Sequence, residues 1–133
     1  MKSFGLLLLL LFFLFGCATD QAAQKKAEGE YLATIPSCHN DNQCRNMWSA
    51  AQTWVAKNSA LKIYSSSETM IQTYYPPKGC ANLGYKVTKE PQGPGSYRFI
   101  IQVICRAYFG CIPEKFEAPL NFNKDLNRFS KAS

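Results

Sequence analysis

The side chains best suited to chemistry in this chain are six cysteines and a single histidine. Thiolates and imidazoles hold structural zinc and also form cysteine–histidine nucleophile pairs. His39 lies between Cys38 and Cys44, but a structural zinc site needs four ligands at recognised spacings, and the sequence offers no such set. We therefore expect no metal and no cofactor, and we interpret His39 as a loop residue that precedes a helix.

Other catalytic patterns are also missing. The sequence contains no G-x-S-x-G, P-loop or dinucleotide fingerprint. A small hydrolase or transferase would need a pocket that joins His39 or Cys80 to carboxylates. Four glutamates lie at expected turns or flanks: Glu68, Glu90, Glu114 and Glu117. Because these positions pair no two carboxylates for glycosidase-type chemistry, we expect no catalytic residues and a protein that is not an enzyme.

Cys17 directly follows an apolar N-terminal segment. Lys2 supplies a positive start, and residues 6–15 form an uninterrupted apolar run of ten residues. At about 1.5 Å per residue this run spans roughly 15 Å, which is half of a bilayer core. It is therefore typical of a signal peptide and not of a membrane-spanning helix. We expect an exported protein from which residues 1–16 are removed.

The end of this segment has a specific pattern. Residues 14–17, Leu-Phe-Gly-Cys, resemble the lipobox of bacterial lipoproteins, although Phe15 is bulkier than the usual residue there. The resemblance implies cleavage before Cys17 and acylation of its thiol and amino group, which anchors the chain in a membrane. Ala18 stands where an inner-membrane retention signal would have Asp, which implies the outer membrane. The competing interpretation is an ordinary secretory signal cut after Ala18 or near Ala22.

The remaining five cysteines meet oxidising conditions after export and are expected to form disulfides. Cys38 and Cys44 are six positions apart, as are Cys105 and Cys111, so each pair can close a small local loop. A crossed arrangement through Cys44 and Cys105 is the rival, because both lie on apolar faces of their expected elements. Five is an odd number, so one thiol is left over, and we assign it to Cys80, an unpaired or alternatively paired loop cysteine. The competing interpretation is a reactive or intermolecular thiol, whose thiolate Lys78 would favour.

Three segments divide the chain. Residues 1–16 are the signal peptide, residues 17–37 are a lipidated N-terminus and flexible tether, and residues 38–133 are a disulfide-stapled domain. The tether is rich in Gln, Ala, Lys and Glu and has no apolar face. A short helix over residues 21–32 is the alternative, because Ala and Gln favour helices.

The spacing of apolar residues predicts a helix over residues 41–57. Asn40 and Gln43 form a capping-box-like start. Trp54 falls beside the apolar stripe, so we expect it to border the core, and Asn58 is a plausible left-handed exit. The stripe recurs at helical spacing: Cys44, Met47, Trp48, Ala51 and Val55.

Downstream of this helix the apolar residues alternate, which predicts strands. A hairpin over residues 61–75 turns at Ser66-Ser67, and strands over residues 82–90 and 97–106 flank a Pro-Gly turn. We expect Tyr97, Phe99, Ile101, Val103 and Cys105 to share the buried face. Residues 116–122 also alternate, but Pro119 limits them to an edge strand or an extended flank.

One helix followed by short-looped strands favours an α+β domain. The predicted fold is one N-terminal amphipathic helix packed on a four- to five-stranded antiparallel meander sheet.

The formal net charge is +6. An exported basic protein is not expected to bind nucleic acid, so we predict a weak attraction to anionic lipopolysaccharide, phospholipid or peptidoglycan, or to an acidic envelope protein. The competing interpretation is a set of solvated strand faces. The basic residues are Lys57, Lys62, Lys78, Lys86, Lys89, Arg98 and Arg106, and the tyrosines expected to be exposed beside them are Tyr74, Tyr75, Tyr85 and Tyr108.

Residues 38–122 carry a second set of features in a fixed order: Cys38 and Cys44, Trp48, Trp54-Val55, Asn58-Ser59, and Cys105 with Phe109-Gly110-Cys111. In this combination the chain resembles small lipoproteins of the Gram-negative outer membrane, although Cys80 does not belong to that pattern. The resemblance implies a location and no activity. We expect a non-enzymatic, periplasm-facing lipoprotein with a binding or structural role. The alternative is an envelope stress or redox-responsive sensor, which the five remaining cysteines suggest.

Overall fold

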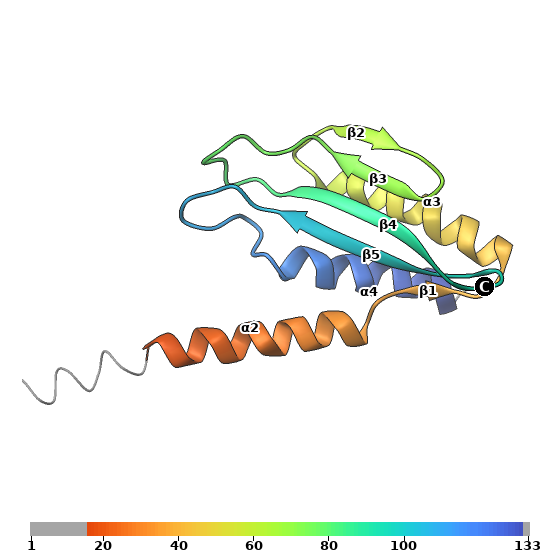
Figure 1. The fold of residues 1–133 in the computed structure, drawn as a ribbon, viewed down its shortest axis with the longest axis horizontal. Coiled ribbons are helices and arrows are strands. Elements are labelled where there is room, and N and C mark those ends of the chain that lie inside the picture. Colours follow the sequence, from red (N-terminus) through yellow and green to blue (C-terminus); the bar gives the residue numbers. More distant parts are fainter. Residues whose placement is uncertain (1–15, 132–133) are drawn as a thin grey trace, which may run out of the picture.

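The computed structural model describes residues 16–131, so the predicted signal peptide lies outside the described residues except for Gly16. Along the chain these residues form the following elements: α2 Gly16–Ala33, β1 Ser37–Cys38, α3 Asp41–Asn58, β2 Ile63–Ser66, β3 Met70–Thr73, β4 Gly84–Gly93, β5 Ser96–Ile104 and α4 Glu117–Lys131 (Figure 1).

The five strands form a single antiparallel sheet in the order β1-β5-β4-β3-β2. From β2 to β5 each strand pairs with its neighbour in sequence, which is the predicted meander. Helices α3 and α4 lie behind one face of this sheet, while α2 runs beside the β5 side of the domain (Figure 1). The predicted α+β class is confirmed.

Helix α3 begins as the sequence predicted. The Asn40 side-chain oxygen accepts a hydrogen bond from the Gln43 backbone N–H at 2.9 Å, and the Gln43 side-chain oxygen accepts one from the His39 N–H at 2.7 Å. These two bonds satisfy backbone donors at the helix start, which lack partners within the helix. The apolar stripe of α3 is buried against the sheet, with Met47, Ala51 and Val55 fully enclosed.

Two details of α3 differ from expectation. Trp54 does not border the core: it is 7% exposed, and its ring makes edge contacts with Tyr85 at 5.6 Å and Phe122 at 5.3 Å between centroids. The reason is that α4 covers this side of α3. The helix also ends without a left-handed residue, because Ser59 is extended and the Asn58 side chain donates to the Trp54 carbonyl.

The prediction of an edge strand over residues 116–122 is wrong, because these residues begin α4. Ala118, Phe122 and Leu126 are buried and recur every fourth position, which is helical spacing. Pro119 lies in the first turn of α4, where a missing N–H removes no hydrogen bond within the helix.

Helix α2 occupies residues 17–33 of the segment 17–37, where a flexible tether was predicted. Helix α2 extends in both directions beyond the short helix proposed for residues 21–32, because Ala, Gln, Lys and Glu are strong helix formers. Its last turn is also fixed to the domain: the Tyr31 hydroxyl donates to the Ile101 carbonyl at 2.9 Å, and the Asn123 side chain donates to the Tyr31 carbonyl at 3.0 Å. Strand β1, which the sequence did not indicate, then pairs Ser37 with Arg98.

The inner face of the sheet supplies the rest of the core. Phe99 and Ile101 of β5 are buried on the predicted face, and Phe99 stacks against Trp48 with centroids 6.0 Å apart. Tyr97 and Val103 are only partly buried, and Cys105, which was expected on the same face, is exposed because β5 ends at Ile104. Tyr85 was expected to be exposed but is 2% exposed. It shares its side of β4 with buried Val87, so strand periodicity and not the tyrosine's polarity decides its position.

Candidate functional site

Two loops at one end of the sheet carry five of the eight large apolar side chains that are exposed among the described residues. They are residues 74–83, which connect β3 to β4, and residues 105–116, which connect β5 to α4; together we call them the loop end. Isolated exposed apolar residues are ordinary, whereas a cluster at one end indicates a contact surface. The large apolar side chains exposed at the loop end are Tyr74, Tyr75, Tyr108, Phe109 and Ile112.

Hydrogen bonds join the two loops into one unit. The Gly79 N–H donates to the Arg106 carbonyl at 2.8 Å, and the Ile112 N–H donates to the Ala81 carbonyl at 2.9 Å. The Arg106 guanidinium donates to the Pro76 carbonyl at 3.2 Å. Because these bonds pair backbone groups of both loops, the loop end is an ordered surface and not two independent connections.

Tyr108 and Phe109 form the aromatic tip of the loop end, and their position depends on one glycine and one disulfide. Gly79 has φ +78°, and a Cβ atom there would come within 2.9 Å of the Tyr108 ring, so glycine permits both the backbone turn and the close approach of the ring. The Cys105–Cys111 disulfide closes the loop that contains Tyr108 and Phe109. Tyr108 is 78% exposed and Phe109 is fully exposed.

The two loops of the loop end also carry three basic residues. Lys78, Arg106 and Lys115 belong to the loop end, and Glu114 is its one acidic residue. Of the basic residues singled out from the sequence, Lys78 and Arg106 lie in the loop end with exposed Tyr74, Tyr75 and Tyr108. Lys62 lies beside the loop end, because its carbonyl accepts a hydrogen bond from the Tyr74 N–H at 3.0 Å.

The other basic residues lie elsewhere, and two have partners of their own. Arg98 forms an ion pair with Glu90 at 2.9 Å, and the Lys89 ammonium lies 4.4 Å from the centre of the Tyr97 ring. For these residues the solvated-strand interpretation fits. The remaining members of the set are Lys57 on α3 and Lys86 on β4.

The loop end lies beside the beginning of α2. A cavity of about 1150 Å³ separates them, lined on one side by Gln21, Gln24 and Glu28 of α2 and on the other by Phe109 and Ile112. Cys17 precedes Gln21 by one helical turn, or about 6 Å along the helix axis. Figure 1 shows the start of α2 and both loops at the same end of the molecule, with the β4–β5 hairpin at the opposite end.

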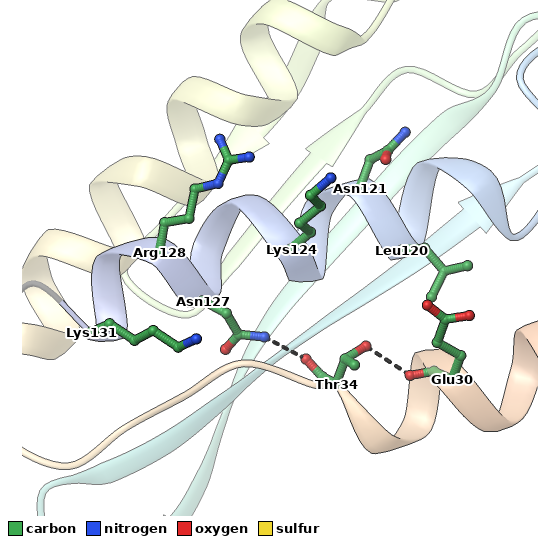
Figure 2. Close-up of a pocket in the computed structure, with 8 residues that line it drawn as sticks. All are labelled: Glu30, Thr34, Leu120, Asn121, Lys124, Asn127, Arg128 and Lys131. Carbon is green, nitrogen blue, oxygen red and sulfur yellow. Dashed lines mark hydrogen bonds between the residues drawn. The ribbon is translucent and has the colours of Figure 1, made fainter.

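The other end of α2 is fixed by α4. The Asn127 side chain donates to the Thr34 carbonyl at 2.8 Å, and the Thr34 hydroxyl donates to the Glu30 carbonyl at 2.8 Å (Figure 2). Beside these contacts lies a shallow cavity of about 570 Å³ with Lys124 and Lys131 on its α4 side. These hydrogen bonds attach the end of α2 to α4.

The cysteines adopt one of the two arrangements that the sequence left open. Cys38–Cys44 and Cys105–Cys111 are both disulfides, with Cα–Cα distances of 5.1 and 5.9 Å. Cys80 is free and partly buried. Its neighbours Gly79 and Ala81 are hydrogen-bonded to the residues that follow Cys105 and Cys111. The segment that contains Cys80 therefore runs alongside the Cys105–Cys111 disulfide.

No described side chains gather as a metal site. His39 is exposed and precedes the α3 cap, as expected, and no three His, Cys, Asp or Glu side chains within residues 16–131 are placed to hold a metal ion. Burial raises the pKa of Tyr31 and that of Tyr85. Both tyrosines lie in the packed part of the fold and not at the loop end.

Sequence reasoning missed Phe109 and Ile112. The available signal was an aromatic pair inside a short Cys-to-Cys segment, which a disulfide holds at the surface.

No family model, curated protein or solved structure matches this chain. Among residues 16–131, no helix has the length and hydropathy needed to cross a membrane.

Proposed function

We propose that this protein is a lipoprotein anchored through Cys17 to the outer membrane, facing the periplasm, with a non-enzymatic binding or structural role in the cell envelope. The observation that carries the proposal is the position of Cys17, directly after a signal-like apolar run and in the first turn of α2. Acylation at that position would anchor the first turn of α2 in the membrane, while the last turn of α2 is attached to the folded domain.

The anchor has a physical basis in acyl-chain burial. Each buried CH₂ group contributes about 0.8 kcal/mol, and a single chain gives only marginal, reversible binding. Acylation of both the thiol and the amino group of Cys17 supplies more than one chain and therefore lasting attachment. The loop end adds exposed apolar and basic side chains, which suit binding and provide no acid–base pair.

Metabolic labelling with radioactive palmitate tests the anchor. The wild-type protein is expected to incorporate label and to fractionate with the outer membrane, whereas the Cys17→Ser variant incorporates none. Cys80→Ser is the matched control, because it removes a thiol outside the predicted lipidation site, and it is expected to label like the wild type. Label retained by Cys17→Ser would rule out lipidation at this residue.

A second candidate function is a redox-responsive sensor, and the placement of Cys80 favours it. The Cys80 thiolate would attack one sulfur of the Cys105–Cys111 disulfide, forming a new S–S bond and releasing the other cysteine as a thiolate, so no external oxidant is needed. Mass mapping of thiols after rapid alkylation tests this function. Disulfide exchange predicts alkylated Cys105 or Cys111 in part of the population. Alkylation of Cys80 alone would show that the disulfide does not exchange and has only a structural role.

A further inference from the structure

We propose that the loop end contacts the surface of the anionic phospholipid bilayer that holds Cys17, with Tyr108 and Phe109 entering the interfacial region. This inference rests on the proposed lipid anchor and adds a second membrane contact, made by the folded domain itself.

The apolar side chains provide the first argument. Phe109 is fully exposed, Ile112 is 77% exposed, and both lie in or directly after the disulfide-closed segment, which holds them out of the core. Aromatic side chains are enriched at membrane interfaces, where an amphipathic ring satisfies both the apolar and the hydrated layer. Tyr108, with its hydroxyl group, has this amphipathic character.

Position provides the second argument. Phe109 lines the same cavity as Gln21 and Gln24, which lie about 6 and 10 Å along the helix axis from Cys17. Interfacial side chains lie within the headgroup layer, which adds only about 5–8 Å to each side of the hydrocarbon core. A bilayer that holds the acyl chains of Cys17 is therefore within reach of the loop tip when α2 stands upright on its surface.

Charge provides the third argument. The loop end carries Lys78, Arg106 and Lys115 against one carboxylate, Glu114. Basic side chains next to a membrane are attracted to anionic headgroups over about one Debye length. The β4–β5 hairpin turn at the opposite end exposes none of the large apolar side chains of the described residues, and the neighbouring end of α4 exposes one, Phe129. The loop end exposes five, and this difference favours an orientation with the loop end toward the bilayer.

Fluorescence quenching in vesicles tests the contact. The full lipidated protein is reconstituted into phosphatidylglycerol-containing vesicles with brominated acyl chains, as Phe109→Trp or as the control Gln92→Trp, whose residue is exposed in the opposite hairpin. The native Trp48 and Trp54 are buried, so the wild-type protein supplies their background signal. Phe109→Trp is expected to show blue-shifted, strongly quenched emission, and Gln92→Trp emission as in water.

Flotation of the same samples separates the two claims. Protein that floats with the vesicles while Phe109→Trp emits and quenches like Gln92→Trp would overturn the loop contact and leave the anchor intact. Protein that does not float would overturn the anchor and the inference together. Replacing phosphatidylglycerol with phosphatidylcholine is expected to reduce the quenching of Phe109→Trp, and equal quenching in both vesicles would overturn the contribution of the basic residues.

Discussion

The two disulfides have the same spacing of six positions but different surroundings. Cys38 and Cys44 are buried, at 0% and 2% exposure, where β1 meets the start of α3. Cys105 is exposed and Cys111 is partly exposed, and their bond closes a loop in solvent. Equal loop lengths give nearly equal restriction of the unfolded chain, roughly 2 kcal/mol for each bond. If the two bonds contribute different amounts to the free energy of unfolding, the difference must therefore come from their surroundings in the folded protein.

This difference separates a bond that supports the fold from a bond that shapes a surface. The buried bond connects β1, which pairs with β5, to α3, which covers the sheet. The exposed bond joins exposed Cys105 to Cys111, which packs against the edge of the core, and it closes the loop that presents Tyr108 and Phe109 to the outside. A disulfide of the same spacing thus stabilises the fold in one region and holds exposed aromatic side chains in place in the other.

The largest expected effect is the removal of the buried bond. The double variant Cys38→Ala, Cys44→Ala loses the restriction of the unfolded chain and also leaves unfilled space in the core, so the free energy of unfolding should fall by about 3–5 kcal/mol. Urea denaturation followed by tryptophan fluorescence measures this loss. A loss no greater than that of the exposed pair would contradict the distinction between the two bonds.

Removal of the exposed bond should cost less stability and alter one loop. For Cys105→Ala, Cys111→Ala we expect the free energy of unfolding to fall by at most about 2 kcal/mol. Because the loop loses its closure, trypsin should cleave after Arg106 faster than in the wild type under native conditions. Peptide mapping over a time course measures the rate. An unchanged rate would show that the hydrogen bonds to Gly79 and Ala81 hold the loop without the disulfide.

Gly79→Ala tests the packing beneath the aromatic tip. The new Cβ would meet the Tyr108 ring, and the left-handed backbone is strained for alanine, so a loss of about 1–2 kcal/mol is expected. Gly29→Ala is the matched control, because its Cβ would meet nothing within 4 Å and alanine is the better helix former. Thermal unfolding of both variants gives the comparison, and an equal effect at the two positions would contradict the close approach of Tyr108.

The smallest expected effect is on the pH dependence of stability. Burial raises the folded-state pKa of Tyr31 and of Tyr85 above the unfolded value of 10.0. Each tyrosine therefore contributes stability that is fully present below pH 10 and is lost as the pH rises toward the folded pKa. Urea midpoints at pH 9 and at pH 11 should differ more in the wild type than in Tyr85→Phe. A difference of the same size in both would exclude Tyr85 as a source.

Local sequence signals predicted the middle of the fold. Asn40 and Gln43 set the start of α3, and alternation over residues 82–106 set β4, β5 and their buried face. These signals are local because capping and strand periodicity act within a few residues. Long-range partners decided what was missed: Trp54 is buried between Tyr85 of β4 and Phe122 of α4, and the end of α2 is held by hydrogen bonds that Tyr31, Asn123 and Asn127 make across the fold.

The candidate site was predictable in part for the same reason. Six-position spacing indicated two local disulfides but did not exclude the crossed pairing, since that choice depends on which elements meet. Residues 116–122 alternate with period two and also begin the four-residue spacing of α4, and so short a stretch cannot decide between them. The position of Phe109 beside the start of α2 required the docking of α2, which the composition of residues 17–37 does not reveal.

The most direct test of the lipid anchor is the mass of the mature N-terminal peptide. Trypsin cleaves after Lys25, so the purified membrane protein should yield a peptide of residues 17–25. We expect this peptide to begin at Cys17 and to carry the added mass of acyl chains on its thiol and amino group. An unmodified peptide that begins at Cys17, or a peptide that begins beyond Ala18, would contradict the lipid anchor.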